Sequence, residues 1–164
     1  TPYPRWLRVS PLLIGVSFMT PVVQAEEANS QPQSTVAVVN STLTDVKIKR
    51  LGEPVKVQYA LKTPQKSASY DVYLAYSAAN MTADVLLFIQ AAGDFTKQPT
   101  PYYAGISGNT DKTVLDLVLP NDLQYVGEHF FYAALIPAGT DLSNLAPVNW
   151  PWEKLSTDHV FVSR

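Results

Sequence analysis

Two histidines are the side chains best suited to acid–base or metal chemistry in this sequence. His129 and His159 are thirty residues apart, and each lies in an apolar segment beside a carboxylate, Glu128 or Asp158. A metal site would need more nitrogen, oxygen or sulfur ligands at short spacing, and no second close-spaced ligand pair accompanies these two residues. We therefore interpret both histidines as outward-facing strand residues and predict no metal.

The motifs of nucleophilic catalysis and phosphate binding do not occur. There is neither a G-x-S-x-G segment nor a glycine-rich phosphate loop, and the absence of cysteine removes disulfides, thiol catalysis and thiolate zinc sites. Glycosidases need two carboxyl groups about 5 to 9.5 Å apart across a cleft, but the carboxylates here are scattered along the chain. The sequence predicts a protein that is not an enzyme and holds no cofactor.

Aromatic side chains in two loops are the best candidates for a binding surface. Trp150 and Trp152 lie in the segment NWPW, and Tyr102 and Tyr103 lie in PTPYYAG. Exposed rings of this kind stack on sugars or anchor protein interfaces. The alternative is that the tryptophans cover one end of the domain, since Trp is highly buried on average. A covering role or a protein contact is favoured over sugar binding.

The charge pattern excludes nucleic acid as the expected partner. The formal net charge is −2, whereas nucleic-acid binding needs a concentrated basic face. The one basic cluster, Lys47, Lys49, Arg50 and Lys56, has no interleaved aromatic residues. It is interpreted as a solvated strand edge.

These side chains must be positioned by strands. A chain of 164 residues, 46% hydrophobic and 16% charged, predicts a single domain, and its thirteen prolines, nine tyrosines and many β-branched residues favour strands over helices. Seven or eight strands are expected over 34–40, 44–50, 54–62, 70–78, 84–90, 112–120, 127–137 and 156–164. The clearest period of two lies in 54–62, and 91–111 is expected to be a long irregular connection with room for one short edge strand. The fold class is an all-β, antiparallel β-sandwich.

The segment GEHFFYAALIP, 127–137, is apolar on both faces and is expected to be a central strand. Neighbouring strand residues point to opposite faces, so Phe130 and Tyr132 share one face and Phe131 lies on the other. If the face with His129 and Phe131 is the outer one and is open, it forms a docking surface. The edge strand 34–40 offers a second possibility, because a partner strand could pair with its unpaired backbone groups.

The first residues predict export. Arg5 and Arg8 precede an apolar run, and Val23 and Ala25 occupy the −3 and −1 positions of a small-residue cleavage site. Residues 1–25 are therefore interpreted as a signal peptide; the alternative, a retained membrane anchor, would need roughly 20 apolar residues in a row. Residues 26–34 are expected to be a flexible lead-in and 35–164 the sandwich. A cysteine-free exported domain fits a bacterial periplasm, outer surface or extracellular location.

Several strand motifs resemble a known family. YDVYLAYSA, DVLLFIQ, VLDLVLP and GEHFFYAALIPAGTD are similar to strands of the immunoglobulin-like or fibronectin type III-like β-sandwich domains of bacterial secreted and surface proteins, over about residues 45–163. The chain lacks the cysteine pair and the central tryptophan of antibody domains, with Tyr73 and Leu74 at the corresponding strand. The resemblance implies an immunoglobulin-like sandwich that serves as a spacer, an assembly module or an adhesive part.

The sequence thus predicts a non-catalytic, exported subunit of a bacterial envelope or surface assembly that works by protein contact. Its partners are expected to be other proteins, copies of itself or a larger envelope complex, with membrane contact only if residues 1–25 are retained. The alternative is a carbohydrate-binding module that uses the Trp and Tyr loops. The candidate interaction surface comprises Trp150, Trp152, Tyr102, Tyr103, Phe131 and His129.

Overall fold

A computed structural model describes residues 31–39, 47–64, 68–78 and 85–164. The predicted signal peptide, 1–25, and most of the predicted lead-in lie outside these residues. Of the predicted lead-in, 26–34, residues 31–34 are described, and Gln33 and Ser34 already belong to the first strand. None of the helices in the described part is long and apolar enough to cross a membrane.

The described residues contain ten strands and two short 3-10 helices. The strands are β1 (Gln33–Val38), β2 (Ile48–Arg50), β3 (Pro54–Lys62), β4 (Tyr70–Ser77), β5 (Leu87–Ile89), β6 (Phe95–Thr96), β7 (Tyr103–Ile106), β8 (Thr110–Val118), β9 (Gly127–Pro137) and β10 (Lys154–Ser163), and the 3-10 helices are η1 (Leu123–Tyr125) and η2 (Pro147–Asn149).

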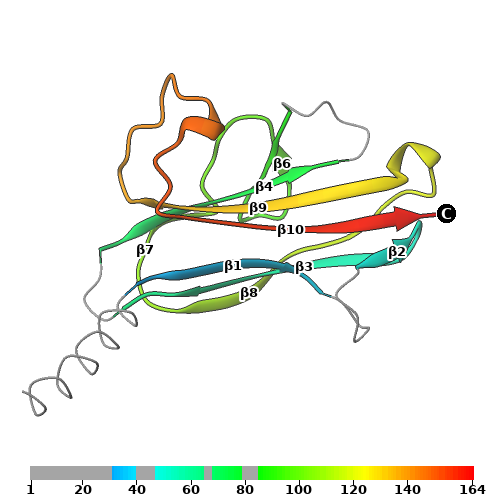
Figure 1. The fold of residues 1–164 in the computed structure, drawn as a ribbon, viewed down its shortest axis with the longest axis horizontal. Helices are drawn as coiled ribbons and strands as arrows, with labels where there is room; N and C mark the ends of the chain where they lie inside the picture. Colours follow the sequence, from blue (N-terminus) through cyan, green and yellow to red (C-terminus); the bar gives the residue numbers. More distant parts are fainter. Residues whose placement is uncertain (1–30, 40–46, 65–67, 79–84) are drawn as a thin grey trace, which may run out of the picture. The chain divides into compact units, whose positions relative to one another are not determined.

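The strands form two sheets that pack face to face (Figure 1). The smaller sheet has the order β1-β3-β8, and the larger has the order β2-β10-β9-β4-β5-β6, with β7 also paired to β4. Every pairing is antiparallel except that of β2 with β10. This confirms the predicted all-β sandwich, and the orders β1-β3-β8 and β4-β9-β10 match strands A-B-E and C-F-G of the immunoglobulin arrangement.

The strand prediction was accurate where periodicity is long and incomplete where strands are short. Strands β3 and β9 have the predicted bounds, 54–62 and 127–137. The connection 91–111 holds two short strands, β6 and β7, rather than one. Two or four residues are too few to show an alternation of period two. Gly93 before β6 and Gly108 after β7 have positive φ values, and so does Gly105 within β7; glycine adopts such conformations readily.

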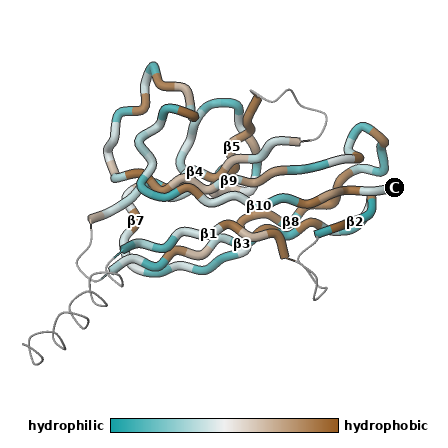
Figure 2. Tube along the Cα trace, viewed as in Figure 1, coloured by the Kyte–Doolittle hydropathy of each residue, from teal (hydrophilic) through white to brown (hydrophobic). Residues whose placement is uncertain are grey.

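The main core fills the space between the sheets. It is built from the inward faces of the long strands, including Tyr59 and Leu61 of β3, Leu74 of β4 and Leu135 of β9, all at most 1% exposed. In β3, buried and exposed residues alternate along most of the strand, as period two requires. Figure 2 shows the apolar colour recurring along the facing strands of both sheets.

The edge of β1 is not open for a partner, which corrects the expectation for 34–40. The backbone N–H of Val36 donates to Ser156 Oγ (3.1 Å), and that of Val38 donates to Asp158 Oδ2 (2.7 Å). Asp158 also forms an ion pair with Lys47. Side chains of β10 thus take the place of a neighbouring strand, which pattern analysis could not reveal because it concerns side chains 120 residues away.

The edge of β8 is guarded in another way. Val57 pairs with Leu115 and Gln58 pairs with Thr113, so Val114 is an extra, bulged residue, and bulges discourage edge-to-edge pairing. Exposed charges on Asp111 and Lys112 add to this protection.

In β9, His129 and Phe131 share one face and Phe130 lies on the other, as the alternation predicts, but the inner and outer faces are the reverse of those expected. His129 and Phe131 face inward and are 0% and 1% exposed, while Phe130 faces outward and is 39% exposed. The expectation that His129 and Phe131 form an open docking surface is therefore wrong. Parity along a strand shows which residues share a face, but the choice of face depends on where the second sheet packs.

Candidate functional site

The outer face of the larger sheet, the face turned away from the smaller sheet, carries a second apolar cluster. Its buried members are Ala75, Phe88, Ala134, Ile136 and Trp150. The outer face of an antiparallel sheet is normally solvated and polar. Such a cluster therefore needs a cover or a partner.

The connection between β9 and β10, residues 138–153, supplies part of the cover. Trp150 is 5% exposed, and the centroid of its ring lies 4.8 Å from that of Tyr73 and 5.8 Å from that of Phe88. Its Nε1–H donates to the carbonyl oxygen of Leu145 (3.2 Å). Trp150 thus packs as a covering side chain and holds the connection against the sheet.

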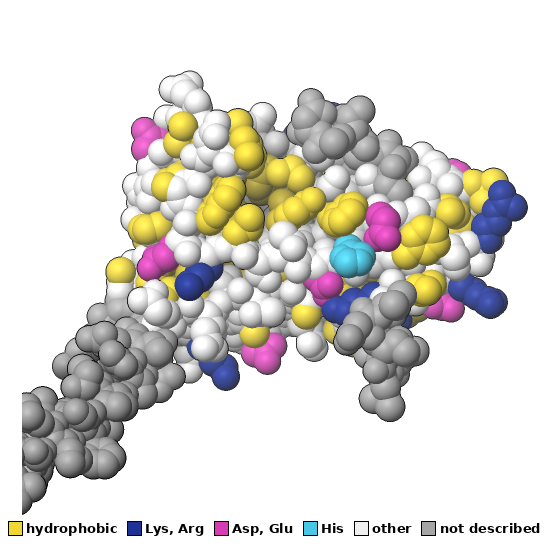
Figure 3. All heavy atoms as spheres, in the orientation of Figure 1, with side chains coloured by type: hydrophobic (Ala, Val, Ile, Leu, Met, Phe, Trp, Pro, Cys, Tyr) yellow, Lys and Arg dark blue, Asp and Glu magenta, His cyan; other side chains and the backbone are white. Residues whose placement is uncertain are grey.

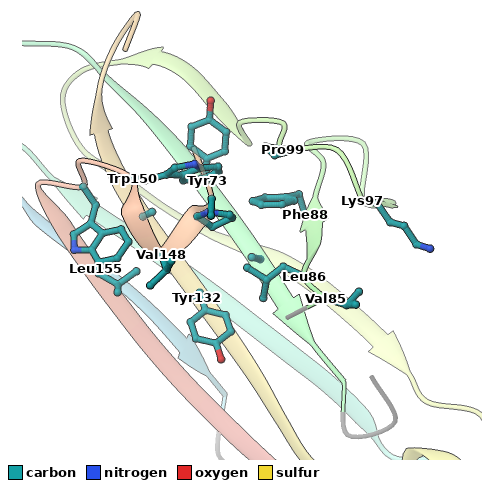
Figure 4. A pocket seen from close by; sticks show the side chains of 15 residues that line it. Tyr73, Val85, Leu86, Phe88, Lys97, Pro99, Tyr132, Val148, Trp150 and Leu155 are labelled. Carbon is teal, nitrogen blue, oxygen red and sulfur yellow. The ribbon is translucent and has the colours of Figure 1, made fainter. Parts of the chain in front are cut away.

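Next to Trp150 the cover is incomplete and leaves a cavity of about 680 Å³, which we call the outer groove. Figure 4 shows its lining. The floor comes from Tyr73, Ala75, Tyr132 and Ala134; one wall from Val85, Leu86, Phe88, Lys97 and Pro99; and the other from Ala146, Pro147, Val148, Trp150, Trp152 and Leu155. Its volume lies within the range of about 300 to 1,000 Å³ that is typical of ligand sites.

The lining is apolar apart from a few groups. Among the described lining residues, Lys97 is the only charged one, and the other side-chain polar groups are the hydroxyls of Tyr73 and Tyr132 and the indole N–H groups. Val148 is 74% exposed and Leu155 is 46% exposed at the rim. Large apolar side chains in this position are available for contact with another molecule.

The apolar surface continues from the groove along β9 and β10. Phe130 and Phe161 are 39% and 38% exposed, and the Phe130 ring centroid lies 5.9 Å from that of His159. Figure 3 shows apolar side chains in a row across this side of the molecule, beside the exposed histidine. His159 is exposed, as expected.

The two predicted loops do not form one site. Tyr102 is 6% exposed and belongs to the core between the sheets, and Tyr103 packs against that core, with its ring centroid 6.4 Å from that of Tyr59. Trp150 and Trp152 instead lie at the outer groove. Of the six candidate residues, only these two tryptophans line the groove.

His129 is part of the core rather than an outward-facing residue. Its Nε2–H donates to the carbonyl oxygen of Tyr125 (2.7 Å), so its Nδ1 accepts the hydroxyl of Tyr76 (2.7 Å). Burial lowers the pKa of His129 below its ordinary value, although the hydrogen bond to Tyr125 acts in the opposite direction. Burial also raises the pKa of the Tyr76 hydroxyl. Both ring nitrogens are thus used to hold β9 against β4 and η1.

Four important residues of the groove were missed by sequence reasoning: Tyr73, Leu86, Phe88 and Val148. A signal was present, because 84–90 and 127–137 are apolar on both faces and so predict a cover over each. Part of the cover is the connection 138–153, whose sequence has no periodicity from which its position could be predicted. Within the described residues, no three or more His, Asp or Glu side chains lie together in a way that could hold a metal ion.

Comparison with known proteins gives likenesses to solved structures alone. No family model matches the chain, and no curated protein matches it significantly in sequence. Among solved structures, the chain is similar to the CARDB domain of the PF1109 protein from Pyrococcus furiosus, which was solved in complex with di-metal ions. The identity is 10%, the TM-score is 0.41, and the match covers 81% of this chain and 90% of that one. The two sheets and the cavity themselves define the class of protein: a two-sheet β-sandwich with an apolar groove on one outer face.

Proposed function

We propose that this protein is a non-catalytic binding module whose outer groove receives apolar side chains of a partner protein. The observation that carries the proposal is the groove itself, a 680 Å³ apolar cavity on a sheet face that is only partly covered. Anchor side chains in desolvated pockets provide most of the affinity of protein interfaces. The exposed Val148, Leu155 and Phe130 around it extend the contact area.

The same features favour a protein over a sugar. Sugars need polar groups that bond their hydroxyls as well as a ring on which to stack. Trp150 is buried and its N–H is already bonded to Leu145, which leaves Trp152 as the one tryptophan of the groove with an accessible face. Of the part of the groove wall that the structure describes, Lys97 is the one charged residue.

The proposed location is the bacterial envelope, surface or exterior. Support comes from the signal-like residues 1–25, from the lack of cysteine and from the resemblance of residues 45–163 to immunoglobulin-like or fibronectin type III-like domains of bacterial secreted and surface proteins. In this setting the module joins its partner to a larger envelope assembly.

Site-specific photocrosslinking in the native cell tests the proposal. A photoreactive phenylalanine analogue at Val148, which is 74% exposed at the groove, is expected to give a crosslinked product of defined mass. The matched control is the same analogue at Leu123, which is 58% exposed in η1 and does not line the groove. The product at Val148 should be lost when Leu86→Arg places a charge in the groove.

Two outcomes would overturn the proposal. Equal crosslinking from Val148 and Leu123, or a Val148 product unaffected by Leu86→Arg, would show that the groove does not select the partner. A Val148 product identified as polysaccharide, lost with Trp152→Ala, would establish the carbohydrate alternative instead.

A further inference from the structure

The charges of the outer groove are unbalanced. Among the described residues that line the groove, Lys97 is the only charged one and none is a carboxylate. Within the described residues, the single ion pair joins Lys47 to Asp158, so no described carboxylate neutralises Lys97. A partner that covers this region therefore meets one positive charge beside an apolar surface.

The position of Lys97 determines where an opposite charge would lie. Figure 4 shows Lys97 at the Phe88 side of the groove, set apart from the Phe88 ring, with its ammonium group pointing away from the aromatic side chains. Long cationic side chains commonly lay their methylene stem on apolar surface and keep the charge in water. A carboxylate could meet this ammonium group while an adjacent apolar side chain enters the groove.

The shape of the face limits the form of the partner. The connection 138–153 and the segment around β6 both stand out from the same side of the larger sheet (Figure 1). Residues from both, including Lys97 and Pro99 on one side and Val148 on the other, form opposing walls of the groove. A flat sheet face, such as that of a second copy of this chain, cannot lie flush on the floor between these walls. A narrow peptide segment can.

We propose that the occupant of the outer groove is a short acidic-apolar segment of a partner protein. It inserts a large apolar side chain between Phe88 and Tyr132 and sets an Asp or Glu carboxylate against Lys97. This inference rests on the proposed protein-binding function and adds the chemistry of the partner. The apolar anchor provides most of the affinity, and the charge pair selects acidic over basic segments.

The charge pair is expected to have a modest and salt-dependent effect. Exposed ion pairs contribute little and are screened by salt. Lys97→Gln should weaken binding about threefold and Lys97→Glu about tenfold at low ionic strength. Both effects should shrink in 0.5 M NaCl. Loss of the groove through Leu86→Arg should abolish binding at any salt concentration.

Selection from a random peptide library displayed on phage tests the inference on the full chain. The immobilised wild-type protein is expected to enrich peptides with an aromatic or large aliphatic residue within a few positions of Asp or Glu. On the Lys97→Glu variant, the same library should enrich Lys or Arg beside the apolar residue. The matched control is Lys56→Glu, an exposed lysine of β3 on the smaller sheet, which should leave the wild-type preference unchanged.

The outcomes separate this inference from the proposed function. Peptides whose binding is lost with Leu86→Arg but whose charge preference is the same on Lys97→Glu would overturn the acidic-segment inference and leave the groove as a protein-binding site. Enriched peptides that are indifferent to Leu86→Arg, or no enrichment over an uncoated surface, would overturn both.

Discussion

The two faces of the larger sheet differ in how they are closed. On the inner face, Phe131 and Leu135 of β9 meet the smaller sheet and are 1% and 0% exposed. On the outer face, Phe130 is 39% exposed, and the connection 138–153 covers part of the apolar surface through Trp150. One strand thus serves both a closed core and an open surface.

The difference separates stability from recognition. Apolar area removed from water stabilises the fold, whereas apolar area left at a surface is available to a partner. Substitutions on the inner face should therefore act on folding, and substitutions around the outer groove should act on binding.

The largest difference is expected between two neighbouring phenylalanines of β9. Phe131→Ala should lower the free energy of unfolding by about 3 to 5 kcal/mol, because it leaves a cavity between the sheets. Phe130→Ala should lower it by about 1 kcal/mol or less, since its side chain is partly solvated. Urea denaturation of both variants makes the comparison, and equal losses would contradict the assignment of the faces.

The tryptophans of the connection should differ in the same way. Trp150→Ala is expected to lower the free energy of unfolding by about 3 kcal/mol, because Trp150 fills the space over Tyr73 and Phe88. Trp152→Ala, at the half-buried edge of the groove, should cost about 1 kcal/mol. Thermal and urea unfolding of the two variants checks this; a larger effect at Trp152 would mean that the cover is organised differently.

The protection of the β1 edge should depend on Asp158. Burial raises the pKa of this carboxyl, but hydrogen bonds from Lys47 and from the backbone N–H groups of Val38 and His159 outweigh that effect and hold the pKa below its ordinary value. Asp158→Ala should lower the free energy of unfolding by about 1 to 2 kcal/mol and speed amide hydrogen exchange at Val38. The exposed Asp116→Ala on β8 is the control, and unchanged exchange at Val38 in the Asp158 variant would contradict the assignment.

The smallest effect is a pH dependence from His129. Its pKa is lowered in the folded protein, so the unfolded chain takes up a proton as the pH falls through about 6.5 while the folded protein resists. Stability should therefore be lost below about pH 6.5, by at most about 1.4 kcal/mol per pH unit.

Urea denaturation at pH 7.5 and 5.5 measures this dependence. The variant His129→Gln should reduce it, and His159→Gln, on the exposed face, should retain it. The same pH dependence in all three proteins would show that His129 is not its source.

The sandwich could be predicted because the long strands alternate apolar and polar residues over enough positions to show which residues are buried. Residues 54–62 alternate so regularly that the bounds of β3 were predicted without error. The short strands β6 and β7 have too few residues to show such an alternation. Likewise, the edge of β1 is closed by Ser156 and Asp158, whose role depends on tertiary contact.

The candidate site was predicted only in part, for a related reason. The NWPW segment indicated an aromatic contact, and Trp150 and Trp152 do lie at the groove. His129 and Phe131 were assigned to the wrong face, because alternation cannot tell which side of a strand meets the second sheet. Tyr73 in the floor and Phe88 in the far wall could not be predicted as site residues, because their place at the groove depends on the pairing of β4 with β5 and β9.

A matched pair of double variants tests the central claim most directly. Val148→Asp with Leu155→Asp places two charges at the rim of the outer groove, where the side chains are 74% and 46% exposed. Ile48→Asp with Val118→Asp places two charges outside the groove, at side chains that are 55% and 57% exposed.

The measurement is the affinity of each variant for the partner captured by crosslinking, at unfolding midpoints close to that of the wild type. If the outer groove binds the partner, the rim variant should lose binding at least tenfold and the control should bind as the wild type does. Equal affinity of the two variants would contradict this role of the groove.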